Sequence, residues 1–339
     1  ASVGPPWFDR YTVPLALILV LLSGIGPVIA WRRATFANAR RNLLAPTLAA
    51  LLTLAALAVT GQASKPAATA LFCCAGFVFA SVGQEFIRGT RARRAMSGEP
   101  LPRALMALVR RNRRRYGGYI VHVGIAVLFI GVAASSSFQH ATELSLSPGQ
   151  STRVGAYTFR YIRPTAALTP RYDPAHTGST LSLGAIIGVT KGGKHVATLS
   201  PSEGFYPASS SQQGSVGSLI GGQPVSQVSI KGGVTRDVWS AVAPNIEAPS
   251  LARIIAIGNR TLPPQDALVA LAALAKTYIQ HPPPAQFHFI VSPLVMWIWL
   301  GGLIVVCGGL IAVWPAPSAV RRRALAGVRE RRAGALAQV

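Results

Sequence analysis

The sequence predicts an integral membrane α-helical protein with five transmembrane helices and one extracytoplasmic β-rich domain. Half of the 339 residues are hydrophobic and only 13% are charged, against roughly 25% charged residues in soluble domains. The hydrophobic residues collect in five long runs. Between the fourth and fifth runs, residues 139–287 instead alternate in polarity, as strands do.

Each hydrophobic run is close to the roughly 20 residues that a helix needs to cross a bilayer. We therefore expect four spans in a helical region 1–138 and a fifth span near the C-terminus, within 288–339, followed by a basic cytoplasmic tail. The expected spans are 13–31, 43–60, 67–87, 119–138 and 289–314.

The basic residues set the expected orientation. The formal net charge is +23, and 20 of the 33 basic residues lie in segments 32–42, 88–115 and 321–332, each beside an apolar run. This placement favours a positive-inside signal over a nucleic-acid-binding surface. Residues 139–287 carry 11 basic and 6 acidic residues, so we expect them outside the cytoplasm.

Several smaller features follow the same plan. Residues 100–111 have the spacing of a basic amphipathic helix on the inner membrane face. Glu85, at the edge of the third span, is more typical of an interfacial ion pair with arginine than of a catalytic acid. Three cysteines lie inside apolar runs, which argues against a disulfide framework or a zinc site. They are Cys73, Cys74 and Cys307.

Residues 139–287 contain several strand and turn signals. Strands are expected at 152–162, 180–190 and 195–199, with a hairpin turn at 191–194. A second strand pair is expected at 225–231 and 235–242, a mobile loop at 209–222, and a helix at 266–279. A region of this length can bury its own core.

His122 is the candidate ligand residue, because it lies one turn inside the fourth span, next to the arginine block. An ionisable side chain at membrane depth is costly and indicates function, and a neutral imidazole can ligate haem iron. On a helix, His122 shares a face with Gly118, Ala126 and Phe129. Small residues on either side would leave room for a flat macrocycle, and Phe129 could pack against its edge. The alternative is a histidine hydrogen-bonded to a backbone carbonyl or to a Ser/Thr on another helix.

Three glycines of the same span recur every seven residues on a different face, which predicts a close helix–helix seam. They are Gly117, Gly124 and Gly131. Among the other histidines, His140 and His288 flank spans at the outer surface and could approach each other as a second haem site. No catalytic residues are identified.

Several ordered blocks resemble CcmF-type cytochrome c-type biogenesis proteins. They are NRRRYGGYIVHVG at 112–124, residues 4–32 around two Gly-Pro pairs, PLVMWIWLGG at 293–302, and LSPSE at 199–203 with Tyr206. The last block departs from the family, which usually has a basic residue where this chain has Gly204.

The resemblance implies a part in a haem lyase of bacterial cytochrome c maturation, in the inner (plasma) membrane. It implies a membrane b-type haem with His122 as a ligand of the haem iron. It also implies partners: a CcmE-type haem chaperone, a CcmH-type apocytochrome-binding subunit and apocytochrome c itself.

The resemblance covers only the C-terminal portion of such proteins. The family's tryptophan-rich segment and the other haem ligand lie upstream of what this chain contains. Two axial ligands are usual for an electron-transfer haem, so we expect the second ligand from the upstream half. The chain is therefore a fragment, a truncated product or half of a split system.

Two other functions stay open. One is a non-catalytic membrane anchor, in which the β-rich domain docks other subunits of the assembly complex. The other is a small-solute transporter, which the glycines and proline near the end of the first span would suit. The sequence shows neither paired charges at mid-membrane nor an inverted repeat in support of a transporter.

Overall fold

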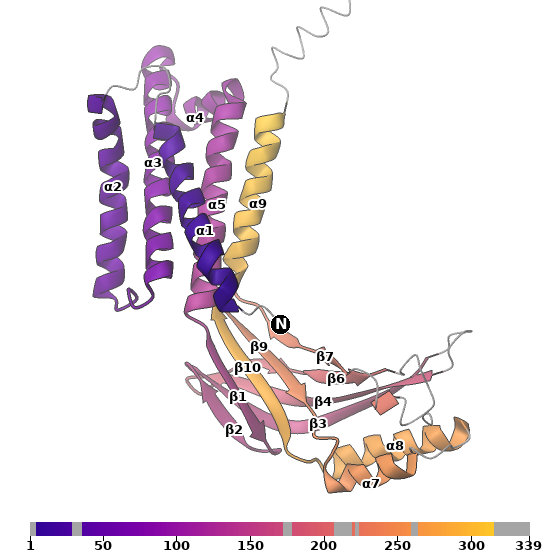
Figure 1. Cartoon of the computed structure of the whole chain (residues 1–339). Helices are drawn as coiled ribbons and strands as arrows, with labels where there is room; N and C mark the ends of the chain where they lie inside the picture. The colour runs from indigo at the N-terminus through magenta and orange to yellow at the C-terminus, as the bar shows by residue number, and fades with distance from the viewer. Residues whose placement is uncertain are drawn as a thin grey trace, which may run out of the picture. The chain divides into compact units, whose positions relative to one another are not determined.

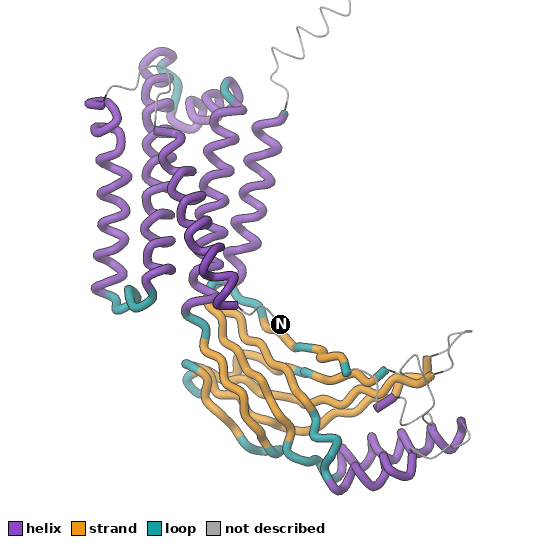
Figure 2. Tube along the Cα trace, in the orientation of Figure 1, coloured by secondary structure: helices purple, strands orange, loops and turns teal. Residues whose placement is uncertain are grey.

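A computed structural model describes residues 5–28, 36–171, 178–206, 219–220, 224–258 and 264–314. The chain divides into two units, one formed by 1–137 with 294–339 and the other by 138–293. Figure 2 shows that the long helices belong to the first unit and the strands to the second. The expected basic tail, His176 and almost all of the loop 209–222 lie outside the described residues.

The first unit is a bundle of six helices in the described chain (Figure 1). They are α1 (Pro5–Val28), α2 (Phe36–Val59), α3 (Pro66–Ser97), α4 (Leu101–Arg111), α5 (Arg113–Ser137) and α9 (Val295–Val313). All but α4 are long and apolar enough to cross a membrane. The predicted fold class is thus confirmed, with α4 as the short, basic, amphipathic helix expected at 100–111.

Helices α5 and α9 form the closest helix pair of the bundle, and glycines explain why. A Cβ added at Gly117 would lie 2.6 Å from the backbone nitrogen of Ala312, and one at Gly124 would lie 2.8 Å from the Gly301 carbonyl. Gly131 is equally tight, with 2.7 Å to the Ile298 nitrogen. The predicted glycine seam is confirmed, and Gly301 supplies small-residue contact from α9.

The second unit consists of two antiparallel sheets. One has the order β1-β10-β9-β8, and the other has the order β2-β3-β4-β6-β7, with β5 also paired to β4. The strands are β1 (His140–Leu146), β2 (Ser151–Val154), β3 (Tyr157–Arg171), β4 (Gly178–Lys191), β5 (Lys194–Leu199), β6 (Ser202–Phe205), β7 (Val225–Gln227), β8 (Ser229–Lys231), β9 (Arg236–Ala243) and β10 (Ala285–Pro293). The β4–β5 hairpin has the predicted turn, because Gly192 and Gly193 both adopt positive φ.

The inner faces of the two sheets share one hydrophobic core. Phe159 of β3 stacks on Phe289 of β10 with ring centroids 4.4 Å apart, and Tyr161 packs edge-on against Phe287. A second core cluster joins β4 and β6 to helices α7 (Pro249–Gly258) and α8 (Pro264–Gln280), with Leu274 fully buried. Helix α8 accounts for the helix expected at 266–279, whereas α7 was not expected.

The expected start of the fifth span is wrong. Residues 289–293, expected to begin the fifth span, form the end of strand β10, and α9 begins at Val295. Leu294 separates the two elements with a left-handed φ of 56°. A buried strand followed by an apolar helix reads as one hydropathy run, which explains the error.

The strand pair expected at 225–231 and 235–242 is confirmed for 229–231, which pair with β9, but not for 225–227. Residues 225–227 form β7 in one sheet, whereas 229–231 form β8 in the other. The chain crosses between the sheets at Val228, a step that residue alternation alone does not reveal.

Candidate functional site

Helix α5 carries His122 among buried positions of the bundle. The helix packs mainly against α9 and α3 (Figure 1). The His122 ring is partly buried, and its Nδ1 has no hydrogen-bond partner in the part of the chain that is described. A buried ring nitrogen without a donor or acceptor is costly. Its lone pair or proton is therefore available to a group outside the described residues.

The residues expected to flank His122 differ in their surroundings. A Cβ built on Gly118 would meet no atom within 4 Å, so this side of the histidine is open. Ala126 is 0% exposed, so its side is filled by neighbouring atoms. Phe129 is partly buried. The expectation of space on both sides stays a prediction, supported at Gly118 and not at the buried Ala126.

The alternative role for His122, a histidine bonded to a carbonyl or hydroxyl of another helix, finds no support at Nδ1 among the described residues. The donor type, the orphaned nitrogen and the open side at Gly118 all fit a haem ligand. The four predicted site residues lie on one stretch of α5, and their role in binding haem stays a prediction. They are His122, Gly118, Ala126 and Phe129.

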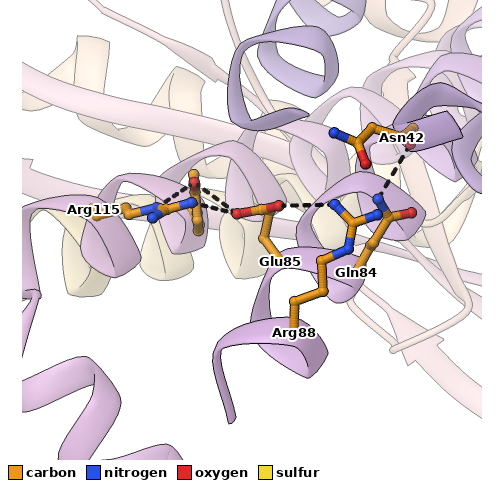
Figure 3. Close-up of polar contacts among 6 residues, drawn as sticks. Asn42, Gln84, Glu85, Arg88 and Arg115 are labelled. Atoms are coloured by element: carbon orange, nitrogen blue, oxygen red, sulfur yellow. Dashed lines mark hydrogen bonds and ion pairs between the residues drawn. The ribbon is translucent and has the colours of Figure 1, made fainter. Parts of the chain in front are cut away.

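A charged cluster lies at the arginine-rich end of α5 (Figure 3). Glu85 of α3 forms ion pairs with Arg115 of α5 and, at 3.7 Å, with Arg88. The Arg115 Nε donates a 2.7 Å hydrogen bond to the Tyr119 hydroxyl. Next to Glu85, the Gln84 side chain donates to the Asn42 carbonyl of α2 at 3.2 Å. The prediction that Glu85 pairs with arginine is confirmed, and the cluster ties α3 to α2 and α5.

The outer histidines do not form a pair. In the β1–β10 register His140 lies opposite Val291, whereas His288 lies opposite Glu143. His140 thus lies beside position 291 of β10, three positions from His288, so the two histidines point to opposite faces of the sheet. His288 packs edge-on against Trp239 with ring centroids 5.3 Å apart. A second haem site shared by His140 and His288 is excluded by this register.

The block at 199–203 forms the corner between β5 and β6. The buried Pro201 accepts a 3.0 Å hydrogen bond from the Ala185 backbone, and Ser202 donates to the Gln227 side chain at 2.9 Å. Burial raises the pKa of Glu203 above its ordinary value. These contacts give the block a structural role in the β-rich unit.

Arg115 is the site residue that sequence reasoning missed. The sequence indicated an arginine partner for Glu85 but gave no means of choosing among the arginines of 88–115. The spacing could have singled out Arg115, because it precedes His122 by seven positions and so lies on nearly the same helix face.

Comparisons with known proteins agree with this architecture. No protein-family model matches the chain. It is 27% identical over 312 residues to the cytochrome c-type biogenesis protein CcmF of Pseudomonas aeruginosa, covering 92% of this chain and 38% of that protein. The cytochrome c-type biogenesis protein ccl1 of Rhodobacter capsulatus is 25% identical over 330 residues, 97% of this chain and 40% of that protein.

A solved structure titled cytochrome c heme lyase CcmF matches with a TM-score of 0.58 and 19% identity, covering 92% of this chain and 41% of that one. The chain is similar to CcmF-type proteins. It spans about two-fifths of the length of the relatives it matches, consistent with the C-terminal portion that the sequence blocks predict. The relatives are named cytochrome c-type biogenesis proteins, and the solved structure shares the fold of this chain.

Proposed function

We propose that this chain is the C-terminal part of a cytochrome c haem lyase that holds a membrane b-type haem through His122 and helps to attach haem covalently to apocytochrome c. The observation that carries the proposal is the orphaned, buried Nδ1 of His122 beside the open side of Gly118. The chemistry that haem supplies there is one-electron redox exchange at iron. The chain's own part is to present a neutral imidazole and to exclude water around it.

The proposed partners follow from the CcmF-type relatives. A CcmE-type chaperone would deliver haem, a CcmH-type subunit would present apocytochrome c, and the upstream half of the same protein would supply the second ligand of the haem iron. We place the protein in the bacterial inner membrane as a multi-pass protein, with 139–287 on the extracytoplasmic side.

The course of the chain supports this orientation. Helix α5 begins in the arginine block at Arg113 and ends at Ser137, just before β1. Helix α9 begins at Val295, directly after β10. Both connections to the β-rich unit therefore leave from the helix ends opposite the arginine-rich end, as the positive-inside rule requires.

The decisive experiment is a spectrum. When the chain is co-expressed with the upstream portion that its relatives possess, reduced membranes should show a b-type α-band. His122→Ala should abolish this band, with His195→Ala, at an exposed histidine of β5, as the control. An unchanged band in His122→Ala would show that the ligand assignment is wrong.

The same strains separate the proposal from a non-catalytic anchor. The size and separate core of the β-rich unit favour a docking role as the second candidate. If His122→Ala cells still mature cytochrome c while deletion of 140–286 stops maturation, the anchor role is correct and the haem role is not.

A further inference from the structure

Arg115 and His122 lie on the same face of α5. Seven residues correspond to roughly 10 Å along a helix axis and to a rotation within about 20° of the starting face. Gly118 lies between them on this face, and a Cβ built there would meet no atom within 4 Å. The surface between the histidine and the arginine is therefore open along the helix.

Arg115 is held in place, unlike an arginine that extends freely to the membrane surface. Its Nε donates to Tyr119 at 2.7 Å, and an Nη2–H donates to Glu85 (Figure 3). The Glu85 side chain is 11% exposed, whereas that of Arg115 is 57% exposed. A buried carboxylate thus fixes a guanidinium whose other side is accessible.

The charges of this cluster do not balance. Two guanidinium groups, those of Arg115 and Arg88, meet the single carboxylate of Glu85, which leaves one positive charge in excess. A guanidinium has five N–H groups, and Arg115 uses two of them within the described chain. The excess positive charge and the unused N–H groups of Arg115 both favour binding of a further acidic group.

We propose that Arg115 binds an acidic side group of the haem that His122 ligates, with Glu85 and Tyr119 fixing its guanidinium. This inference rests on the proposed function, because it assumes haem at His122. A lipid headgroup would also offer acidic oxygens at this membrane edge. The shared face with His122, the open position at Gly118 and the fixed guanidinium favour haem, since a headgroup requires none of them.

The proposal has an electrostatic consequence with a definite sign. A positive charge near haem stabilises the ferrous form over the ferric form. At roughly 10 Å and an effective dielectric constant near 20, one charge changes that equilibrium on the order of tenfold. A tenfold change is about 59 mV for a one-electron couple.

The test is a redox titration of the b-type haem in membranes that contain the chain and its upstream portion. Arg115→Gln should lower the reduction potential by about 59 mV, a tenfold shift toward ferric iron. Glu85→Gln should raise it, because a negative charge is removed. The matched control is Arg114→Gln, which removes the same charge from the same turn but about 80° away from the His122 face. A potential that shifts equally in Arg115→Gln and Arg114→Gln would overturn the proposal.

Two further comparisons deal with misfolding and with lipid. The double variant Arg115→Gln/Glu85→Gln leaves no buried carboxylate unpaired. Its reduction potential should lie about 59 mV below that of Glu85→Gln alone. Reconstitution with haem whose acidic groups are methyl esters removes the proposed contact, so esterification should weaken haem binding to wild type but not to Arg115→Gln. Weakening that is equally large in both would show that Arg115 binds a lipid headgroup or another group instead.

The proposed function and this inference fail in different ways. If His122→Ala keeps the α-band, the ligand assignment is wrong. If His122→Ala loses the band while Arg115→Gln titrates like Arg114→Gln, the ligand stands and only the role of Arg115 is wrong.

Discussion

Two faces of helix α5 use glycine for opposite purposes. On the face toward α9, a Cβ at Gly117 or Gly124 would come within 2.6–2.8 Å of backbone atoms. On the face that carries His122, a Cβ at Gly118 would meet nothing within 4 Å. The first face brings two backbones together, and the second leaves space beside a histidine. Residue type alone therefore does not assign a role to a membrane glycine.

Strand β10 shows the same contrast between a packed face and an open one. Phe287 and Phe289 are fully buried between the sheets and stack on each other with centroids 5.4 Å apart. His288, between them, points to the other face, where it meets Trp239. In both elements one face is closely packed, and the other face carries a histidine.

The contrast on α5 predicts the largest effect. Gly124→Leu should prevent α5 and α9 from packing, because the new side chain would overlap the Val305 nitrogen and the Gly301 carbonyl. We expect a loss of about 5 kcal/mol or more, in the exceptional range for a single substitution. The measurement is the yield and thermal stability of the detergent-solubilised chain.

Gly118→Leu is the matched control, since it makes the same change on the open face. Its stability should stay within about 0.5 kcal/mol of wild type, while the haem bound at His122 should decrease. Equal destabilisation by both substitutions would show that the two faces do not differ as described.

The sequence predicted the packed face of α5 well, because it depends on periodicity. Glycines seven residues apart lie on one stripe of a helix, and a membrane helix with such a stripe needs a close neighbour. The arginine block likewise marked the end of the span, which placed His122 one turn inside it. The pattern could not show that Ala126 would be filled and Gly118 left open, because that depends on the neighbouring helices.

The boundary between β10 and α9 was not predictable from hydropathy. Residues 289–293 are as apolar as the helix that follows, yet their side chains alternate between the core and the outer face. Only the pairing of β10 with β1 and β9 separates the two elements. The partner of Glu85 likewise required the packing of α3 against α5, since the segment 88–115 offers ten arginines.

Phe289→Ala tests the difference between the two faces of β10. The ring is fully buried and stacks on both Phe159 and Phe287, so its loss should destabilise the β-rich unit by about 3–4 kcal/mol. Thermal unfolding of the full chain in detergent, followed by the β signal in circular dichroism, measures this change. His288→Ala, on the neighbouring position and the other face, should cost less than about 1 kcal/mol.

If 289 instead lay in a membrane span, the outcome would differ. A lipid-facing phenylalanine could be shortened with little effect on the β-rich unit, and the two substitutions would give similar unfolding curves. The pair of variants therefore tests the corrected start of α9 directly.

The smallest expected effect concerns Glu203 of β6. Burial raises the pKa of this carboxyl in the folded chain above its ordinary value of 4.5. The folded state then binds the proton more tightly than the unfolded state, so this group lowers stability as the pH rises from the ordinary value through the folded pKa. Glu203→Gln should remove this dependence.

The thermal midpoint of Glu203→Gln should therefore exceed that of wild type at pH 7 and equal it near pH 4. Ser202→Ala, at the adjacent position, serves as the control, because it removes a hydrogen bond to Gln227 without changing the charge. Its effect on the midpoint should be the same at both pH values. A Glu203→Gln midpoint below that of wild type at pH 7 would mean that the carboxylate is stabilised in the folded chain, since only a lowered pKa produces that sign.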